Sequence, residues 1–109
     1  MWRKRARVGG VMGGRFFTEY GEGTDAEDAF RKAVEQAQYD YGHSGYTGTI
    51  AEKTKFIMVE MPEGQDEEDF AWAILRGGII EGTVTAKDGP AGCIDLGDGD
   101  FLFFGNASL

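Results

Sequence analysis

The chain has 109 residues, which is enough for one domain with one modest hydrophobic core. Hydrophobic residues make up 41% of it, and this favours a folded protein over a disordered one. The sequence has no apolar run long enough to span a bilayer, and its basic start lacks the apolar stretch of a secretory signal. A single cysteine, Cys93, excludes an internal disulfide and fits a reducing compartment. We therefore expect a cytoplasmic protein without a membrane segment.

The formal net charge of −8 is unevenly distributed along the chain. Beyond Met12, seven basic residues stand against 19 acidic ones, a balance of −12. Such a surface disfavours direct DNA binding by the acidic body. It serves either ordinary solubility or docking on a basic, nucleic-acid-binding partner. Residues 1–12 are expected to form a basic arm or a lead-in strand, and residues 13–109 a single domain. The basic residues before Met12 are Arg3, Lys4, Arg5 and Arg7.

The first part of the chain predicts a strand followed by a helix. Arg15 to Tyr20 is short and rich in aromatic and β-favouring residues, so it is expected to be a strand. Thr24 and Glu27 have the spacing of a capping box at a helix start, and Gly42 is expected to end the helix. Apolar residues at three- and four-residue spacing predict one buried stripe. The stripe comprises Ala26, Ala29, Phe30, Ala33, Val34, Ala37 and Tyr41.

The second part alternates strands with another helix. Thr49 to Glu52 and Lys55 to Met61 are predicted strands. The stretch "QDEEDFAWAILRGG" predicts a helix with acids in its first turn and two glycines as its stop. Its expected buried stripe is Phe70, Ala73 and Ile74, widened by Trp72 and Leu75.

The tail consists of apolar runs separated by Asp-Gly and Gly-Asp steps, which are turn signals. We expect strands over Ile80 to Ala86, Gly92 to Leu96 and Phe101 to Phe104. The predicted fold is therefore α+β, with two helices packed on a mainly antiparallel sheet and a C-terminal β-meander. Because Phe101 to Phe104 is apolar on both faces, we expect one face to pack on the core and the other on a partner chain. This predicts a homo-oligomer.

Several kinds of chemistry find no support in the sequence. One cysteine and one histidine cannot form a zinc site without carboxylates. The spacing in "DLGDGD" is that of a hairpin turn and not of an EF-hand. The glycine-rich "GGVMGGR" lacks the Lys-Ser/Thr step of a P-loop. Cys93 lies in an apolar strand pattern, which favours a buried small hydrophobe over a nucleophile, and the alternative is a reactive pair with His43. No metal and no cofactor are predicted.

The stretch "YDYGHSGYTGTIAEK" is the main candidate for a ligand-binding loop. It combines aromatic rings, hydroxyls, an imidazole and glycine amides, which a planar, phosphate-bearing ligand would need. The predicted ligand-binding residues, including nearby cations for phosphate, are Tyr39, His43, Tyr46, Thr47, Thr49, Lys53, Lys55 and Arg15. Alternatively, the stretch is only a helix end, with Tyr41 buried and Gly42 as the stop. A third possibility is a small enzyme that uses His43 as general acid or base.

A second candidate surface is the acidic start of the second helix. Its residues are Asp66, Glu67, Glu68 and Asp69. Exposed carboxylates at this place would steer a basic partner toward the protein. The alternative role of these residues is to compensate the helix dipole. We assign them as the predicted partner-binding residues.

The sequence carries a resemblance to a known group of proteins. Most of Gly13 to Leu109, and most clearly the stretches "YGHSGYTGTIAEK" and "GPAGCIDLG", resembles small, largely uncharacterised proteins borne by phages, prophages and some archaea. The resemblance implies a small accessory protein that acts in the cytoplasm of an infected or lysogenised cell. It brings no catalytic residue with it. We therefore expect a non-enzymatic protein that inhibits a host process, such as a defence process. It would bind a host protein or sequester a nucleotide-like ligand. The alternatives are a small enzyme and a purely structural accessory protein.

Overall fold

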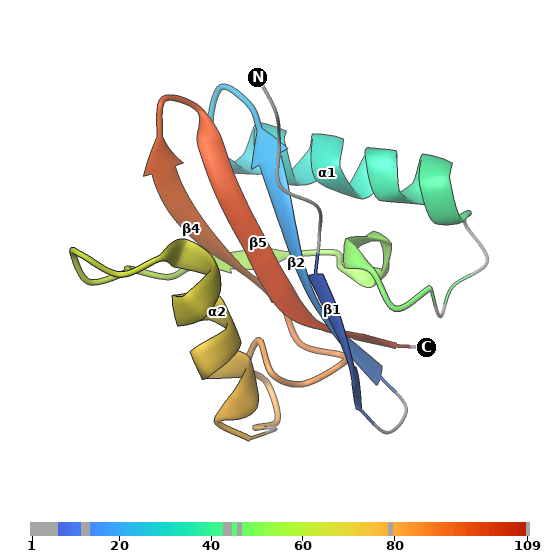
Figure 1. Cartoon of the computed structure of the whole chain (residues 1–109). Coiled ribbons are helices and arrows are strands. Elements are labelled where there is room, and N and C mark those ends of the chain that lie inside the picture. Colours follow the sequence, from blue (N-terminus) through green and yellow to red (C-terminus); the bar gives the residue numbers. More distant parts are fainter. Residues whose placement is uncertain (1–6, 12–13, 43–44, 46, 79, 109) are drawn as a thin grey trace.

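The computed structural model describes residues 7–11, 14–42, 45, 47–78 and 80–108. The described residues form a five-stranded sheet with one α-helix on each face (Figure 1). The strands are β1 (Arg7–Val11), β2 (Gly14–Glu22), β3 (Phe56–Met58), β4 (Ala91–Gly97) and β5 (Asp100–Ser108). Their order in the sheet is β1-β2-β5-β4-β3, and only the β3–β4 pair is parallel. The predicted α+β class with two helices on a mainly antiparallel sheet is confirmed.

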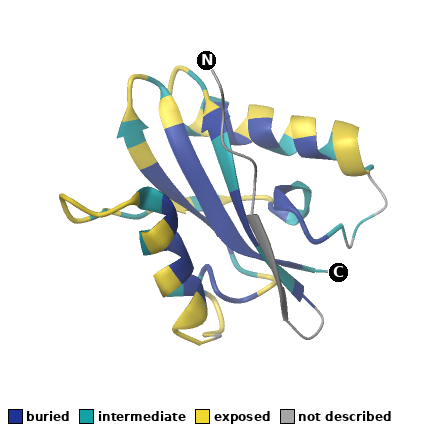
Figure 2. Ribbon diagram, viewed as in Figure 1, coloured by how far each residue is buried: buried dark blue, intermediate teal, exposed yellow. Residues whose placement is uncertain are grey.

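Strand β5 lies in the middle of the sheet and supplies both hydrophobic cores (Figure 2). Phe101 and Phe103 belong to the core under α1 (Ala26–Tyr41), whereas Leu102 and Phe104 belong to the core under α2 (Glu67–Arg76). Each of these four side chains is at most 5% exposed. The expectation that a partner chain covers one face of this strand is therefore wrong, because the chain's own helices cover both. The homo-oligomer stays a prediction.

Helix α1 begins one residue later than the sequence pattern indicates. The side chain of Asp25 caps it by accepting from the Asp28 amide at 2.8 Å, and the Asp28 carboxylate in turn accepts from the Thr24 amide at 3.0 Å. The predicted Thr24–Glu27 capping box is thus shifted by one residue, and an aspartate takes the role of the threonine. At the other end, Gly42 stops the helix as expected, but Tyr41 is 58% exposed and does not extend the buried stripe.

Helix α2 is confirmed, and Trp72 and Leu75 are buried as predicted, but the rest of its buried face differs from the predicted one. Ala73 is exposed, while Phe70 and Ile74 are only partly buried. The fully buried positions are Glu68, Ala71, Trp72 and Leu75. These positions have the three- and four-residue spacing of one helix face, but that face is rotated about the helix axis from the predicted one. The sequence pattern did not place Glu68 on this face, because a carboxylate is rarely buried without partners.

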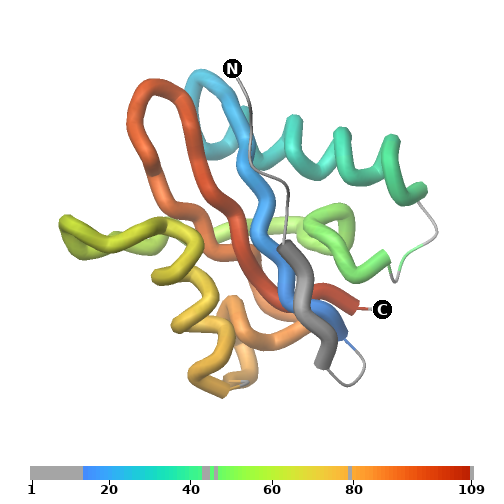
Figure 3. The backbone as a smooth tube through the Cα atoms, in the orientation of Figure 1, coloured from blue at the N-terminus to red at the C-terminus, as the bar shows by residue number. Residues whose placement is uncertain are grey.

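Two predicted strands are absent from the described residues, and one is shorter than expected. Figure 3 traces the backbone through these segments. Thr49 caps a short 3-10 helix, η1 (Ile50–Glu52), by accepting from the Ala51 amide, and this removes the expected strand there. Lys55 to Met61 contributes only the three residues of β3. The chain over 80–89 forms successive turns, in which the Thr83 and Thr85 hydroxyls bond to each other and to the Ile80 backbone. Side-chain bonds to the local backbone thus outcompete β-propensity at both places.

The turn between β4 and β5 is the predicted one. Gly97, Asp98 and Gly99 all have positive φ, a conformation that glycine and aspartate adopt most readily. The expected C-terminal meander is reduced to this β4–β5 hairpin, since the residues preceding β4 form turns.

Candidate functional site

The two threonines of the predicted ligand-binding loop are bonded within the chain. The Thr47 hydroxyl donates to the Glu52 carboxylate at 2.8 Å, and the Thr47 amide donates to the same oxygen at 3.1 Å. The hydroxyls of Thr47 and Thr49 lie 2.8 Å apart. Because Thr47 gives its proton to Glu52, Thr49 must donate to Thr47. Both hydroxyl protons therefore serve to fold the loop onto η1 instead of facing a ligand.

Lys53 follows η1 and is only 4% exposed. Its ammonium donates to backbone carbonyls of the turns before β4, at 2.7 Å from Gly89, 3.2 Å from Lys87 and 3.5 Å from Ala86. Burial lowers the pKa of this amine to about 8, and the nearby Asp88 carboxylate opposes that shift only in part. The lysine expected to neutralise phosphate thus holds two segments of the backbone together.

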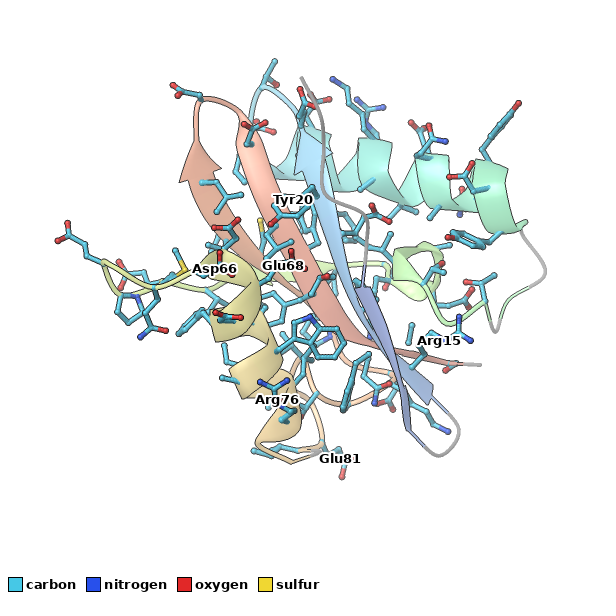
Figure 4. The ribbon with its side chains drawn as sticks, viewed as in Figure 1. Arg15, Tyr20, Asp66, Glu68, Arg76 and Glu81 are labelled. Carbon is cyan, nitrogen blue, oxygen red and sulfur yellow. The ribbon has the colours of Figure 1, made fainter. Side chains whose placement is uncertain are left out.

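The remaining predicted ligand-binding residues do not converge on one place. Tyr39 is 86% exposed on α1, and Lys55 is exposed just before β3. Arg15 lies near the start of β2, toward the other end of that strand from Tyr20 (Figure 4). His43 and Tyr46 lie outside the described residues. The structure therefore brings Thr47, Thr49 and Lys53 into the fold, and places Tyr39, Lys55 and Arg15 apart from one another.

The acidic start of α2 is partly interior. Asp66 caps the helix by accepting from the Glu68 and Asp69 amides, each at 3.1 Å. Glu68 is 5% exposed and accepts from the Thr18 hydroxyl at 3.2 Å. Glu67 accepts from the Tyr20 hydroxyl at 2.8 Å. Figure 4 shows Tyr20 and Glu68 close together beside Asp66. Three of the four predicted partner-binding carboxylates therefore accept hydrogen bonds within the fold, although only Glu68 is buried, while Asp66 and Asp69 are both exposed.

The Tyr20 hydroxyl is affected by the same contacts. Burial, the hydrogen bond to Glu67 and the neighbouring carboxylates together raise the pKa of this phenol far above its ordinary value of 10.0. Tyr20 therefore stays protonated and acts as a fixed hydrogen-bond donor between β2 and α2. Sequence reasoning missed this residue, because its partners lie 47 and 48 positions further along the chain.

A groove of about 640 Å³ runs beside the first half of α1. Phe30 and Val34 supply its apolar part, and the opposite wall comes from Lys53 and Thr54. Four carboxylates and one guanidinium line its rim. These rim residues are Asp25, Glu27, Asp28, Glu35 and Arg31. The period of α1 already indicates that Phe30 and Val34 share a face, but no pattern showed that residues 53–54 would form the second wall.

Ion pairs along α1 organise the rim of this groove. Asp28 lies 2.9 Å from the Lys32 ammonium and also pairs with Arg31, which reaches Glu35 at 3.3 Å. The hydrogen bond from Lys32 lowers the pKa of Asp28 to about 2, helped by the bond from the Thr24 amide. This carboxylate therefore stays ionised across the physiological range. Even with the cations Arg31 and Lys53 included, the four carboxylates leave the groove net negative.

More carboxylates gather at the end of the molecule where α1 begins. Glu22 of β2 is directly opposite Asp100 of β5 in the sheet, and the Gly23 amide donates to the Gly99 carbonyl at 3.0 Å. This contact joins the loop before α1 to the β4–β5 turn, which carries the exposed Asp98. The groove thus opens beside a surface to which two distant parts of the sequence contribute acids. The pairing of β2 with β5 brings these acidic residues together, so their proximity could not be predicted from their spacing in the sequence.

Other site chemistry finds little support in the described part of the chain. No group of three or more histidine, cysteine, aspartate or glutamate side chains there is arranged to hold a metal ion. Cys93 is fully buried, and burial raises the pKa of its thiol to about 12, so it is a poor nucleophile as expected. Among the same residues, no helix has the length and apolarity to cross a membrane.

No family model, curated protein or solved structure matches this chain.

Proposed function

We propose that this protein is a non-enzymatic binding protein that captures a basic segment of a partner protein in the groove beside α1. The observation that carries this proposal is the pairing of an apolar strip, formed by the partly buried Val34 and by Phe30, which is 8% exposed, with a rim of four carboxylates. An apolar strip gains from burying aliphatic side chains, and an acidic rim attracts lysine or arginine and rejects acidic partners. The acidic surface around the start of α1 enlarges the attractive field.

A nucleotide-like ligand has less support than a protein partner. A phosphate group would need a cation and free donors, but Lys53 and the Thr47 and Thr49 hydroxyls are engaged within the fold. The groove itself carries a net negative lining, which repels phosphate. The basic segment of a nucleic-acid-binding protein would suit it better, because such a segment carries the lysine and arginine that a negative lining attracts.

The biological setting is part of the same proposal. We propose that the protein is borne by a phage and acts in the host cytoplasm, where it inhibits a host process by occupying its partner. The resemblance of "YGHSGYTGTIAEK" and "GPAGCIDLG" to phage- and prophage-borne proteins supports this setting. The absence of a cystine and the burial of Cys93 suit a reducing cytoplasm.

A peptide-binding experiment tests the groove. The probes are fluorescein-labelled twelve-residue peptides in which leucine alternates with lysine or with glutamate, together with labelled ATP. Fluorescence anisotropy should show that the lysine peptide binds, that its affinity falls as NaCl rises, and that the other two probes bind at least tenfold more weakly.

Matched variants locate that binding. Glu27→Lys with Glu35→Lys reverses two charges on the groove, while Glu63→Lys with Glu81→Lys reverses two exposed charges elsewhere. The groove variant should lose at least tenfold in affinity for the lysine peptide, and the control variant less than threefold. Equal losses in the two folded variants would show general charge attraction instead of a groove, and preferred binding of ATP would overturn the proposal.

A further inference from the structure

Strand β3 (Phe56–Met58) is at the end of the sheet and has a neighbour, β4, on one side only. Its backbone bonds show which residues face that neighbour. The Lys55 carbonyl accepts from the Ala91 amide at 3.0 Å, and the Val59 amide donates to the Cys93 carbonyl at 2.8 Å. Since alternate residues of a strand turn to the same side, Ile57 also faces β4. The amides and carbonyls of Phe56 and Met58 therefore point outward, and no described residue bonds to them.

The side chains on this edge are apolar and open to solvent. Ile57 is 47% exposed and Met58 is 52% exposed. Phe56 packs on the α1 side against Phe30, with ring centroids 5.0 Å apart. By alternation, Met58 is on the α1 side of the sheet and Ile57 on the α2 side. An unpaired edge with apolar side chains on both faces is a template for another strand.

We infer that the edge of β3 pairs with β3 of a second copy of this chain, in an antiparallel arrangement about a two-fold axis through Ile57. Outward-facing residues must be opposite each other for backbone bonds to form. This register satisfies that condition. Phe56 of each copy lies opposite Met58 of the other copy, so the two-fold axis produces two such pairs. It also sets the two Ile57 side chains against each other as a cross-strand apolar pair.

Charge favours a second copy over an unrelated strand. Lys55 precedes β3 and Glu60 follows it, and both are exposed. An antiparallel copy brings Lys55 of one chain to the end where Glu60 of the other lies, so that opposite charges approach twice across the symmetry axis. The interface is therefore self-complementary in hydrogen bonds, apolar side chains and local charge. It does not depend on the function proposed for the groove.

Cross-linking tests the register. Opposite residues in a pair of this type have Cα atoms about 4.5 Å apart, which is within the range for a disulfide. Ile57→Cys should form a disulfide-linked dimer under mild oxidation, whereas Tyr39→Cys, at an 86% exposed position on α1, should not. Cys93 does not interfere, because it is fully buried and its side chain packs in the core on the α1 side. Equal yields from the two variants would reflect random collision and would overturn the inference.

Light scattering tests assembly of the native edge. The wild type should have a dimer mass at 100 µM, and the dimer fraction should rise with NaCl, because salt screens the repulsion between two chains of charge −8. Met58→Lys should be monomeric with an unchanged melting temperature, because the side chain is exposed and a charge on the edge opposes pairing. A monomer mass for the wild type at every salt concentration would overturn the inference. So would a dimer that Met58→Lys leaves intact.

Discussion

The ammonium of Lys53 lies 2.7 Å from the carbonyl oxygen of Gly89, 36 positions further along the chain. This bond, with those to Ala86 and Lys87, attaches the segment after η1 to the turns that lead into β4. Burial removes water from this ammonium and disfavours its charged form, so its pKa falls to about 8. The contact therefore has a measurable consequence for stability.

The free energy of unfolding should rise between pH 7 and pH 9. The folded pKa of Lys53 is about 8 and its ordinary value is 10.5. In that interval the unfolded chain binds more protons at Lys53 than the folded chain, so stability increases with pH, by about 1 kcal/mol. Cys93 opposes the rise increasingly as the pH approaches 9.0, the ordinary pKa of a thiol, because its raised pKa makes the folded state hold its proton more tightly than the unfolded state. Urea unfolding at pH 7, 8 and 9 measures the slope.

The matched control for this prediction is Lys53→Met. It keeps the length of the side chain and removes the titrating amine, so the part of the slope due to Lys53 should disappear. Parallel pH profiles for the wild type and the variant would show that the amine is not desolvated as the structure indicates.

The cap of α1 offers a test of register. Asp25→Ala should cost about 1 kcal/mol of unfolding free energy, because the Asp28 amide loses its acceptor. Thr24→Ala should cost about half of that or less, because its amide bond to Asp28 survives the change and the hydroxyl makes only a 3.4 Å contact. Chemical denaturation of both variants measures the difference. A larger loss for Thr24→Ala would restore the capping box expected from the sequence.

Sequence reasoning found the elements whose signals are local. Period and charge located α1 and α2, and the Gly-Asp-Gly turn located the β4–β5 hairpin. It failed where a side chain bonds to the nearby backbone, as Thr49 does in capping η1, because that choice depends on a single hydrogen bond. It also failed for contacts between distant segments of the chain, such as the wall that residues 53–54 add to the groove beside Phe30. These contacts join residues that no short pattern connects.

Tyr41 separates the two interpretations of the helix end. If the side chain were buried, Tyr41→Ala would cost a few kcal/mol. At 58% exposure, the change should lie within about 0.5 kcal/mol of the wild type. Phe30→Ala, which removes a ring from the core under α1, should cost about 3–5 kcal/mol. Thermal and urea unfolding of the two variants give the comparison, and a large loss for Tyr41→Ala would contradict the placement of this ring.

Gly92 should tolerate no side chain. A Cβ at this position would overlap the ring of Phe104, which is fully buried in the core under α2. Gly92→Ala should therefore cost at least about 1–3 kcal/mol through overpacking. The double variant with Phe104→Leu should recover part of that loss relative to Phe104→Leu alone, since the smaller side chain makes room. Additive losses in the double-mutant cycle would show that the two residues do not meet.

The carboxylates at the start of α2 should differ in how much each contributes to stability. Asp66→Ala should cost about 1 kcal/mol, because it removes the acceptor of two backbone amides. Tyr20→Phe should cost a similar amount, because Glu67 loses a hydrogen bond of 2.8 Å. Asp69→Asn should change the unfolding free energy by about 0.5 kcal/mol or less, since that side chain is exposed.

The same three variants also test where the basic partner binds. If it binds in the groove beside α1, none of the three changes should lower the affinity for the lysine peptide by more than threefold. If Asp69→Asn lowered the affinity for that peptide tenfold while the free energy of unfolding stayed unchanged, the docking surface would lie on α2, as the sequence first indicated.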